Sequence, residues 1–176
     1  MRIVYFVAAS VDGFIATPDG GVEWLHRVQV EGEDYGYADF FASIDSMVMG
    51  RGSYEKAVSL GNWPYASLPC WVMTARDLQP VHPMITISHD SPDRVVAGIR
   101  RRGLENLWLV GGAALAGDFR THGLITEYIV SVIPAILGDG VPLVAAGGSP
   151  TQLYLVDSNT YPSGVVTLRY LTEATP

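Results

Sequence analysis

The stretch "LWLVGGAALAGDF" (107–119) places two adjacent glycines between a run of large apolar residues and a segment with the pattern of a helix. The apolar run predicts a buried strand, and the glycines mark the turn into the helix. A strand that ends in glycine lets a ligand approach the backbone, because no side chain stands in the way. The helix that follows directs its unsatisfied N–H groups and positive dipole end at the same point. Gly111 and Gly112 therefore mark a candidate pyrophosphate site, and a tight turn without a ligand is the alternative.

The rest of the chain repeats this alternation of strand and helix. Short apolar runs, typical of strands buried on both faces, lie at residues 3–9, 46–50, 70–74, 84–88 and 107–111. Helical patterns separate several of them, at residues 33–44, 52–58, 91–103 and 112–123. The third helix has Ser91 as an N-cap, Pro92 at its first position and Gly103 as a stop. Such alternation predicts an α/β fold with a mainly parallel sheet and helices on both faces.

The last third of the chain differs, because three strand-like segments follow one another without a helix. They cover residues 125–136, 151–161 and 164–174, and turn-forming residues separate them. The alternation in "VVTLRYL" (165–171) favours antiparallel strands with one wetter face. We therefore expect a mixed sheet, parallel at its centre and antiparallel at its C-terminal edge, in a single domain over residues 1–176.

Composition narrows the classes of function. A net charge of −7 disfavours a nucleic-acid partner, and the three arginines at 100–102 suit the end of a helix. The single cysteine, Cys70, lies in an apolar run and fits a buried core position in a reducing compartment. No apolar run is long enough to span a membrane, and the four histidines lack metal-ligand spacing. We expect a cytoplasmic protein without a metal.

A second strand-to-helix turn lies in "SMVMGRGSYE" (46–55). Gly50 permits close approach, Arg51 offers a guanidinium fork for phosphate, and Ser53 is able to cap the helix and donate to a phosphate oxygen. The alternative is an ordinary capped helix with a solvated arginine.

A third turn, "VMTARD" (72–77), ends a strand with Thr74, Ala75 and Arg76. An arginine at the carboxyl end of a strand, next to two phosphate-type sites, suits the 2′-phosphate of NADP. Three such turns together favour a dinucleotide over three unrelated loops.

Three motifs occur in an order that resembles the dihydrofolate reductase superfamily. They are "AASVDGFIA" (8–16), "VMGRGSYE" (48–55) and "VGGAALAGDF…LITEYIVSVIPAILGDGVPL" (110–143). The chain is most similar, over residues 2–172, to the riboflavin-biosynthesis reductase domain and its stand-alone relatives. This resemblance implies a dihydrofolate reductase-like three-layer fold, a small-molecule substrate and NADPH as the cofactor.

The resemblance also implies particular cofactor contacts. Gly111 and Gly112 match a glycine pair that carries a cis peptide in dihydrofolate reductases. Positions near the nicotinamide match Ala8, Ile15 and Ala16. The remaining implied cofactor residues are Gly50, Arg51, Ser53, Thr74, Ala75, Arg76, Val110, Ala113, Ala114 and Leu115.

The substrate side is less sharply defined. Reduction of a C=N or C=O bond needs a proton on the heteroatom, from an acid or an ordered water. The resemblance places Asp34 near the acid that serves the pterin, with Glu33 and Asp39 as competitors. Trp24 resembles a tryptophan that packs near the active site. Asp12 is a further catalytic candidate, although Asp-Gly first indicates a loop-organising turn, and the loop at 16–26 is a candidate lid.

We therefore expect an NADPH-dependent reductase that acts on a small heterocyclic or ribosylamino-pyrimidine-like carbonyl or imine. A true dihydrofolate reductase, a non-catalytic NADP-binding protein and a fold-only relative are the alternatives. The chain lacks the H-x-E and P-C-x-x-C motifs of zinc deaminases, which excludes deamination. By family analogy, we expect a homodimer through the C-terminal strands.

Overall fold

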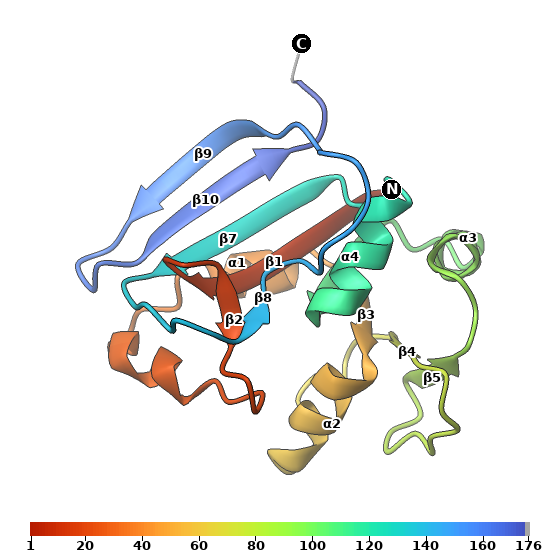
Figure 1. The fold of residues 1–176 in the computed structure, drawn as a ribbon. Helices are drawn as coiled ribbons and strands as arrows, with labels where there is room; N and C mark the ends of the chain where they lie inside the picture. Colours follow the sequence, from red (N-terminus) through yellow and green to blue (C-terminus); the bar gives the residue numbers. More distant parts are fainter. Residues whose placement is uncertain (175–176) are drawn as a thin grey trace.

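A computed structural model describes residues 1–174 and shows an α/β fold built on one eight-stranded sheet (Figure 1). The strands lie side by side in the order β5-β4-β3-β6-β1-β7-β10-β9. Their bounds are β1 (Arg2–Ser10), β3 (Ser46–Gly50), β4 (Cys70–Met73), β5 (Ile85–Ser88), β6 (Asn106–Gly111), β7 (Glu127–Ile133), β9 (Tyr154–Thr160) and β10 (Val166–Leu171).

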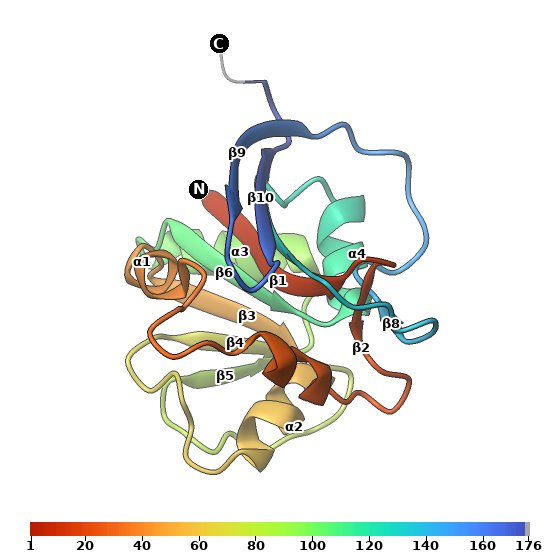
Figure 2. The same cartoon turned by 90° about the vertical axis from the view of Figure 1, so that its left-hand side faces the viewer.

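The direction of the strands confirms the expected mixed sheet. The six strands from β5 to β7 pair in parallel, whereas β10 is antiparallel to both β7 and β9. Strand β7 is the junction, because it runs parallel to β1 on one side and antiparallel to β10 on the other. Figure 2 shows the β9–β10 hairpin at one edge of the molecule, far from β5 at the other edge.

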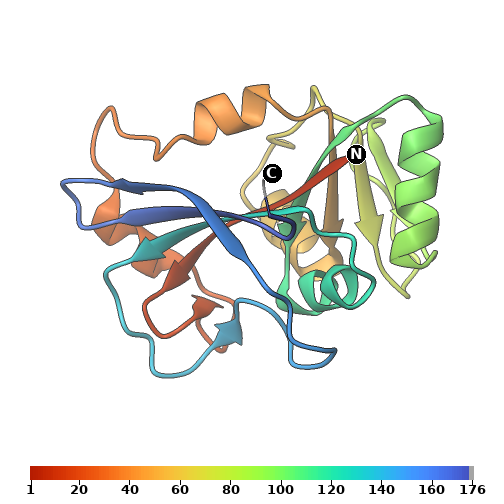
Figure 3. The ribbon, with the colours of Figure 1, turned by 90° about the horizontal axis from the view of Figure 1, so that it is seen from above.

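Helices cover both faces of the sheet, as predicted. Figure 3 shows α1 and α4 on opposite sides of the central strands. One buried cluster joins the sheet to α3 and α4, and a second joins the opposite face to α1 and α2. The helices are the 3-10 helix η1 (Glu23–Val28), α1 (Tyr37–Ala42), α2 (Arg51–Ser59), α3 (Pro92–Arg101) and α4 (Ala113–Thr121).

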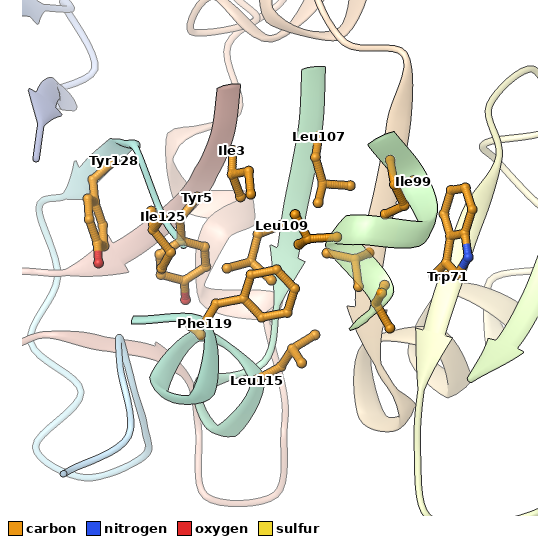
Figure 4. Packing of buried hydrophobic residues seen from close by; sticks show 14 residues of the cluster. Ile3, Tyr5, Trp71, Ile99, Leu107, Leu109, Leu115, Phe119, Ile125 and Tyr128 are labelled. Carbon is orange, nitrogen blue, oxygen red and sulfur yellow. The ribbon is translucent and has the colours of Figure 1, made fainter. Parts of the chain in front are cut away.

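Residues 107–119 supply the centre of the buried cluster that joins the sheet to α3 and α4. Leu109 of β6 and Phe119 of α4 are fully buried, and Figure 4 shows Phe119 lying between Leu109 and Leu115. Tyr5 of β1 is equally buried, and its hydroxyl donates to the Leu143 carbonyl at 2.7 Å. Leu109 before the glycine pair and Phe119 after it lie in the same buried cluster, so β6 and α4 pack against each other.

Two local features differ from the predictions. The helix expected over residues 33–44 is shorter, because Tyr35 (φ 57°) and Gly36 (φ 80°) take left-handed conformations that a helix cannot contain. A separate two-stranded sheet, β2 (Phe14–Ala16) with β8 (Val141–Pro142), was not predicted from either short segment. It holds the loop after β1 against the chain that precedes β9.

Other expectations are met in part. Ser91 stands at the N-cap of α3, but its side chain makes no capping hydrogen bond; Gly103 follows the helix with φ 76°. Cys70 is fully buried. At the end of α3 the Arg102 guanidinium lies 5.0 Å from the centre of the Trp71 ring, a cation–π contact.

Within residues 1–174, no helix combines the length and apolar character needed to cross a bilayer.

Candidate functional site

Two helices begin where two neighbouring strands end. Helix α2 starts directly after β3, and α4 starts one residue after β6, which pairs with β3. Their N-caps are Gly50 and Gly112, and neither cap supplies a side-chain hydrogen bond. The first-turn N–H groups of a helix have no intrahelical acceptor. Both helices therefore offer free amide donors at the same edge of the sheet.

Gly111 and Gly112 differ in backbone conformation and in the space around them. Gly111 has φ 117°, which disfavours any residue with a side chain, and a Cβ there would lie 3.5 Å from the Tyr5 ring. Gly112 has φ −29° and a Cβ there would meet only Ser53, at 3.9 Å. The peptide bond between them is trans, which corrects the cis bond implied by the resemblance.

Ser53 links the two helix starts. Because α2 begins at Arg51, Ser53 lies within the first turn and does not cap the helix, contrary to the prediction. Its Oγ instead accepts a hydrogen bond from the Gly112 N–H at 3.1 Å. The hydroxyl proton of Ser53 is still available to donate to a ligand.

A cavity of about 700 Å³ opens in front of these helix starts, and we call it the first cavity. Arg51 lines it, and its Nη1 donates to both carboxylate oxygens of Glu55, at 2.9 and 3.0 Å. The other lining residues come from both helix starts, the end of β4 and the β8 region: Gly50, Gly52, Ser53, Met73, Thr74, Ala75, Gly112, Ala113, Ala114, Leu115, Asp118, Val141, Pro142 and Ala145.

The predicted 2′-phosphate segment reaches this cavity in part. Thr74 and Ala75 line it, whereas the exposed Arg76 is not among the lining residues. The Arg76 N–H donates to Thr74 Oγ1 at 3.0 Å, and His89 Nδ1 lies 2.6 Å from the Thr74 carbonyl oxygen. Hydrogen bonds thus hold the backbone of this segment, while the Arg76 side chain is not part of the cavity lining.

A second cavity, of about 730 Å³, adjoins the first, since both are lined by Gly52, Ser53, Gly112 and Val141. Lys56 lies on one side, and its Nζ is 3.6 Å from Glu23 Oε1 across the cavity. Two predicted nicotinamide contacts, Ile15 and Ala16, line it as well, and the remaining lining residues are Asp19, Gly20, Gly21, Val22, Glu55 and Ser59. We call the two cavities together the glycine groove. Val110 lines neither of them.

A third, smaller cavity of about 200 Å³ contains the predicted acid, and we call it the Asp34 cavity. It brings Asp34 together with Ala8 of β1, although these residues are far apart in the sequence. Of the three competing acids, Glu33 and Asp39 are not among its lining residues. The other lining residues are Phe6, Leu25, Val28, Gln29, Tyr35, Ser131 and Ile133.

The Asp34 carboxylate is held by backbone donors. Gly36 N–H donates to Oδ1 and Ala38 N–H to Oδ2, both at 2.9 Å. The hydrogen bonds from Ala38 and then Gly36 lower the pKa of Asp34 below its ordinary value. Asp34 is therefore a carboxylate at neutral pH and accepts hydrogen bonds.

Tyr35, next to this acid, is held in a strained conformation. Its φ of 57° is unusual for a residue with a side chain, and its ring lies edge-on to Tyr161 with 4.9 Å between centroids. Its hydroxyl donates to the Val28 carbonyl and contacts Ser163 Oγ at 3.1 Å. Strain of this kind persists only where several contacts enforce it, and here they fix the turn that presents Asp34.

Trp24 and Asp12 lie outside the three cavities. Trp24 packs in the small cluster around Val28, and its buried Nε1 has no hydrogen-bond partner. Asp12 accepts hydrogen bonds from Ser10 Oγ (2.6 Å) and from the N–H groups of Leu137 (3.1 Å) and Gly138 (2.7 Å). These hydrogen bonds match the predicted role of Asp12 in organising the loop. They do not bring Asp12 to any of the three cavities.

Sequence reasoning missed several lining residues. Val141 and Pro142 reach the glycine groove where β8 pairs with β2, and the Ala145 N–H donates to the Ala113 carbonyl at 3.1 Å. Ser131 carries a hydroxyl group within the otherwise apolar run of β7. This polar residue in an apolar strand was the one feature of the sequence that could have marked Ser131 as a lining residue. Within residues 1–174, no group of three His, Cys, Asp or Glu side chains is arranged to hold a metal ion.

Comparison with known proteins agrees with this architecture. Residues 65–167 match the family described as the RibD C-terminal domain. Two uncharacterized proteins of Bacillus subtilis (strain 168) are similar over nearly the whole chain. YwjB is 33% identical over 93% of this chain and 94% of its own length; YyaP is 27% identical over 96% and 94%.

Solved structures extend the comparison. A protein of Shewanella sp. PV-4, provisionally assigned to riboflavin biosynthesis, superposes with a TM-score of 0.89 and 26% identity, covering 97% of this chain and 98% of that one. The Thermotoga maritima diaminohydroxyphosphoribosylaminopyrimidine deaminase/5-amino-6-(5-phosphoribosylamino)uracil reductase gives a TM-score of 0.75 at 12% identity, covering 97% of this chain and 56% of that one, and shares the fold. The fold is that of the dihydrofolate reductase-like class. Within it, this chain belongs to the RibD C-terminal domain family.

Proposed function

We propose that the protein is an NADPH-dependent oxidoreductase that delivers hydride to a C=N or C=O bond of a small pyrimidine-like heterocycle. The observation that carries this proposal is the convergence of two uncapped helix starts and the Ser53 hydroxyl on one groove. Such a groove suits a diphosphate, because amide donors and helix dipoles both favour negative charge. Membership of the RibD C-terminal domain family supports the same activity.

The residues of the groove fit the proposed cofactor. A Cβ at Gly52 would meet nothing within 4 Å, so the start of α2 leaves open space beside the first-turn amides. Thr74 and Ala75 would flank the adenosine end, and Ile15 with Ala16 would flank the nicotinamide end. When bound, the reduced nicotinamide supplies the hydride.

The Asp34 cavity would hold the substrate. Its carboxylate would accept N–H groups of the heterocycle and fix the orientation of the ring, which is a large part of what such a site contributes to rate. Because Asp34 is ionised at neutral pH, the proton for the reduced heteroatom would come from a water molecule bound at the carboxylate. Phe6, Leu25 and Ile133 would exclude other water from the ring.

Calorimetry with NADPH and NADH at matched salt tests the cofactor. We expect tight binding of NADPH and weak binding of NADH, and we infer that Arg76 provides the difference by closing over the 2′-phosphate. Arg76→Ala should therefore weaken NADPH binding at least tenfold more than NADH binding. Equal weakening would remove this role from Arg76, and no binding of either cofactor would overturn the proposal. We also infer a cytoplasmic setting, because NADPH and a free Cys70 both suit a reducing compartment.

A further inference from the structure

The one charged side chain that lines the candidate substrate site is negative. Among the residues that line the Asp34 cavity, the carboxylate of Asp34 is the charged group, and none is a lysine, arginine or histidine. The rest of the lining is mainly apolar or aromatic. A phosphate monoester carries about −1.5 to −2 charge and is bound in proteins by arginine, lysine or clustered amides. The Asp34 cavity offers it a like charge.

The second cavity, where the nicotinamide end of the cofactor would lie, is also lined by more negative than positive side chains. Three carboxylates, those of Asp19, Glu23 and Glu55, line the second cavity with the single cation Lys56. Lys56 is already paired with Glu23 at 3.6 Å, and Arg51 in the first cavity is paired with Glu55 at 2.9 Å. A phosphorylated side chain that extended from the Asp34 cavity toward Lys56 would therefore meet more negative than positive side-chain charge, while the diphosphate of the proposed cofactor would occupy the free amides at the start of α2.

The hydrogen-bonding capacity of Asp34 is complementary to a different kind of ligand. Each carboxylate oxygen accepts one backbone N–H, and a carboxylate has about four acceptor sites. Two sites are then left for the N–H groups of a ligand. The cavity, at about 200 Å³, is smaller than a typical drug-sized pocket of about 300 Å³ or more. It suits one ring system with adjacent N–H donors.

We infer that the substrate is a phosphate-free nitrogen heterocycle, neutral or cationic, that presents N–H donors to Asp34. This inference rests on the proposed function, since it takes the Asp34 cavity as the substrate site. It separates this chain from the phosphoribosylamino-uracil reaction named for the Thermotoga maritima protein.

A matched pair of ligands tests the inference: 5-amino-6-ribosylaminouracil and its 5′-phosphate, titrated into the protein by calorimetry with and without saturating NADP⁺. We expect the phosphate-free compound to bind at least tenfold more tightly in both conditions. Equal or tighter binding of the phosphate ester overturns the inference. If neither compound binds while NADPH does, the inference fails and the oxidoreductase proposal stands. If NADPH does not bind, the proposed function itself fails.

Three substitutions locate the effect. Asp34→Asn should weaken the phosphate-free ligand about tenfold or more, because it removes a charged acceptor. Asp39→Asn is the matched control: Asp39 is an exposed acid on α1 outside the cavity, and its replacement should leave binding unchanged. Glu23→Gln should release Lys56 and improve binding of the phosphate ester several-fold, with little change for the phosphate-free ligand. Loss of affinity with Asp39→Asn equal to that with Asp34→Asn would show an indirect effect of α1 and overturn the assignment.

Discussion

The Gly112 N–H donates to Ser53 Oγ at 3.1 Å and joins the start of α4 to the start of α2. This bond bridges the two cavities of the glycine groove, because both residues line both cavities. It fixes the spacing of the two sets of first-turn amides before any ligand binds. Preorganisation of this kind reduces the entropy that a ligand must lose on binding.

Replacement of Ser53 should therefore affect folding and binding together. Ser53→Ala leaves the Gly112 N–H without its acceptor, and we expect the free energy of unfolding to fall by about 1 kcal/mol. NADPH binding should weaken as well. Urea unfolding and calorimetry measure the two effects, with Ser67→Ala, at an exposed loop position outside the three cavities, as the control. Unchanged NADPH affinity would show that Ser53 has only a structural role.

The glycine pair allows stability and binding to be separated. Gly111→Ala should destabilise the fold by about 1–3 kcal/mol, because alanine at φ 117° is strained, although its Cβ would make only an ordinary contact with Tyr5. Gly112→Ala meets only ordinary contacts and should leave the melting temperature nearly unchanged. Its methyl group would nevertheless reduce NADPH affinity, since it occupies the wall shared by both cavities. Full affinity in Gly112→Ala would mean that the glycine only turns the chain.

Glu127 should make stability depend on pH. Its buried carboxylate accepts hydrogen bonds from Arg2 Nε at 2.7 Å and Arg169 Nε at 2.6 Å. Burial alone would raise the pKa of Glu127, but the bonds from Arg2 and Arg169 outweigh burial and the pKa lies below its usual 4.5. The stabilisation is therefore complete above about pH 4.5 and is lost as the pH falls through the lower, folded-state pKa.

Glu127→Gln should accordingly cost about 2–3 kcal/mol at neutral pH, because the two guanidinium groups lose their shared partner. Urea unfolding at pH 7 and at pH 3.5 measures the difference between the variant and the wild type. We expect this difference to shrink at the lower pH. A constant difference would show that packing, and not charge, makes Glu127 important.

From the exposed strand β9 we predict that the protein self-associates. It pairs with β10 on one side only, and Tyr154, Leu155 and Val156 expose 41%, 56% and 40% of their surfaces. An apolar edge strand of this kind is a ready template for pairing, and we propose that a second copy of the chain covers it. Light scattering should find a dimer for the wild type and a monomer for Leu155→Lys. A wild-type monomer at micromolar concentration would contradict the proposal.

Much of the fold could be predicted from local patterns. Strands β3, β4 and β6 are continuous apolar runs because both of their faces are covered by helices, and such runs are visible in any one segment. The short helix α1 was predicted too long, because the left-handed turn at Tyr35 and Gly36 depends on tertiary contacts with Val28 and Ser163. Strands β2 and β8 were not predicted, because each is too short to show an apolar or alternating pattern. Each is a strand only by virtue of its pairing with the other.

Local backbone preferences and periodicity were enough to predict the glycine turn after β6 and the order of strands and helices, and the family resemblance pointed to the acids near residue 34. The packing of the folded chain settled which of these groups meet. It turned Ser53 from a helix cap into an acceptor for Gly112, separated Arg76 from the wall of the first cavity, and placed Asp34 rather than Glu33 or Asp39 beside Ala8. Contacts of this kind join residues tens of positions apart, and their geometry is fixed by the packing of whole elements, which no short stretch of sequence encodes.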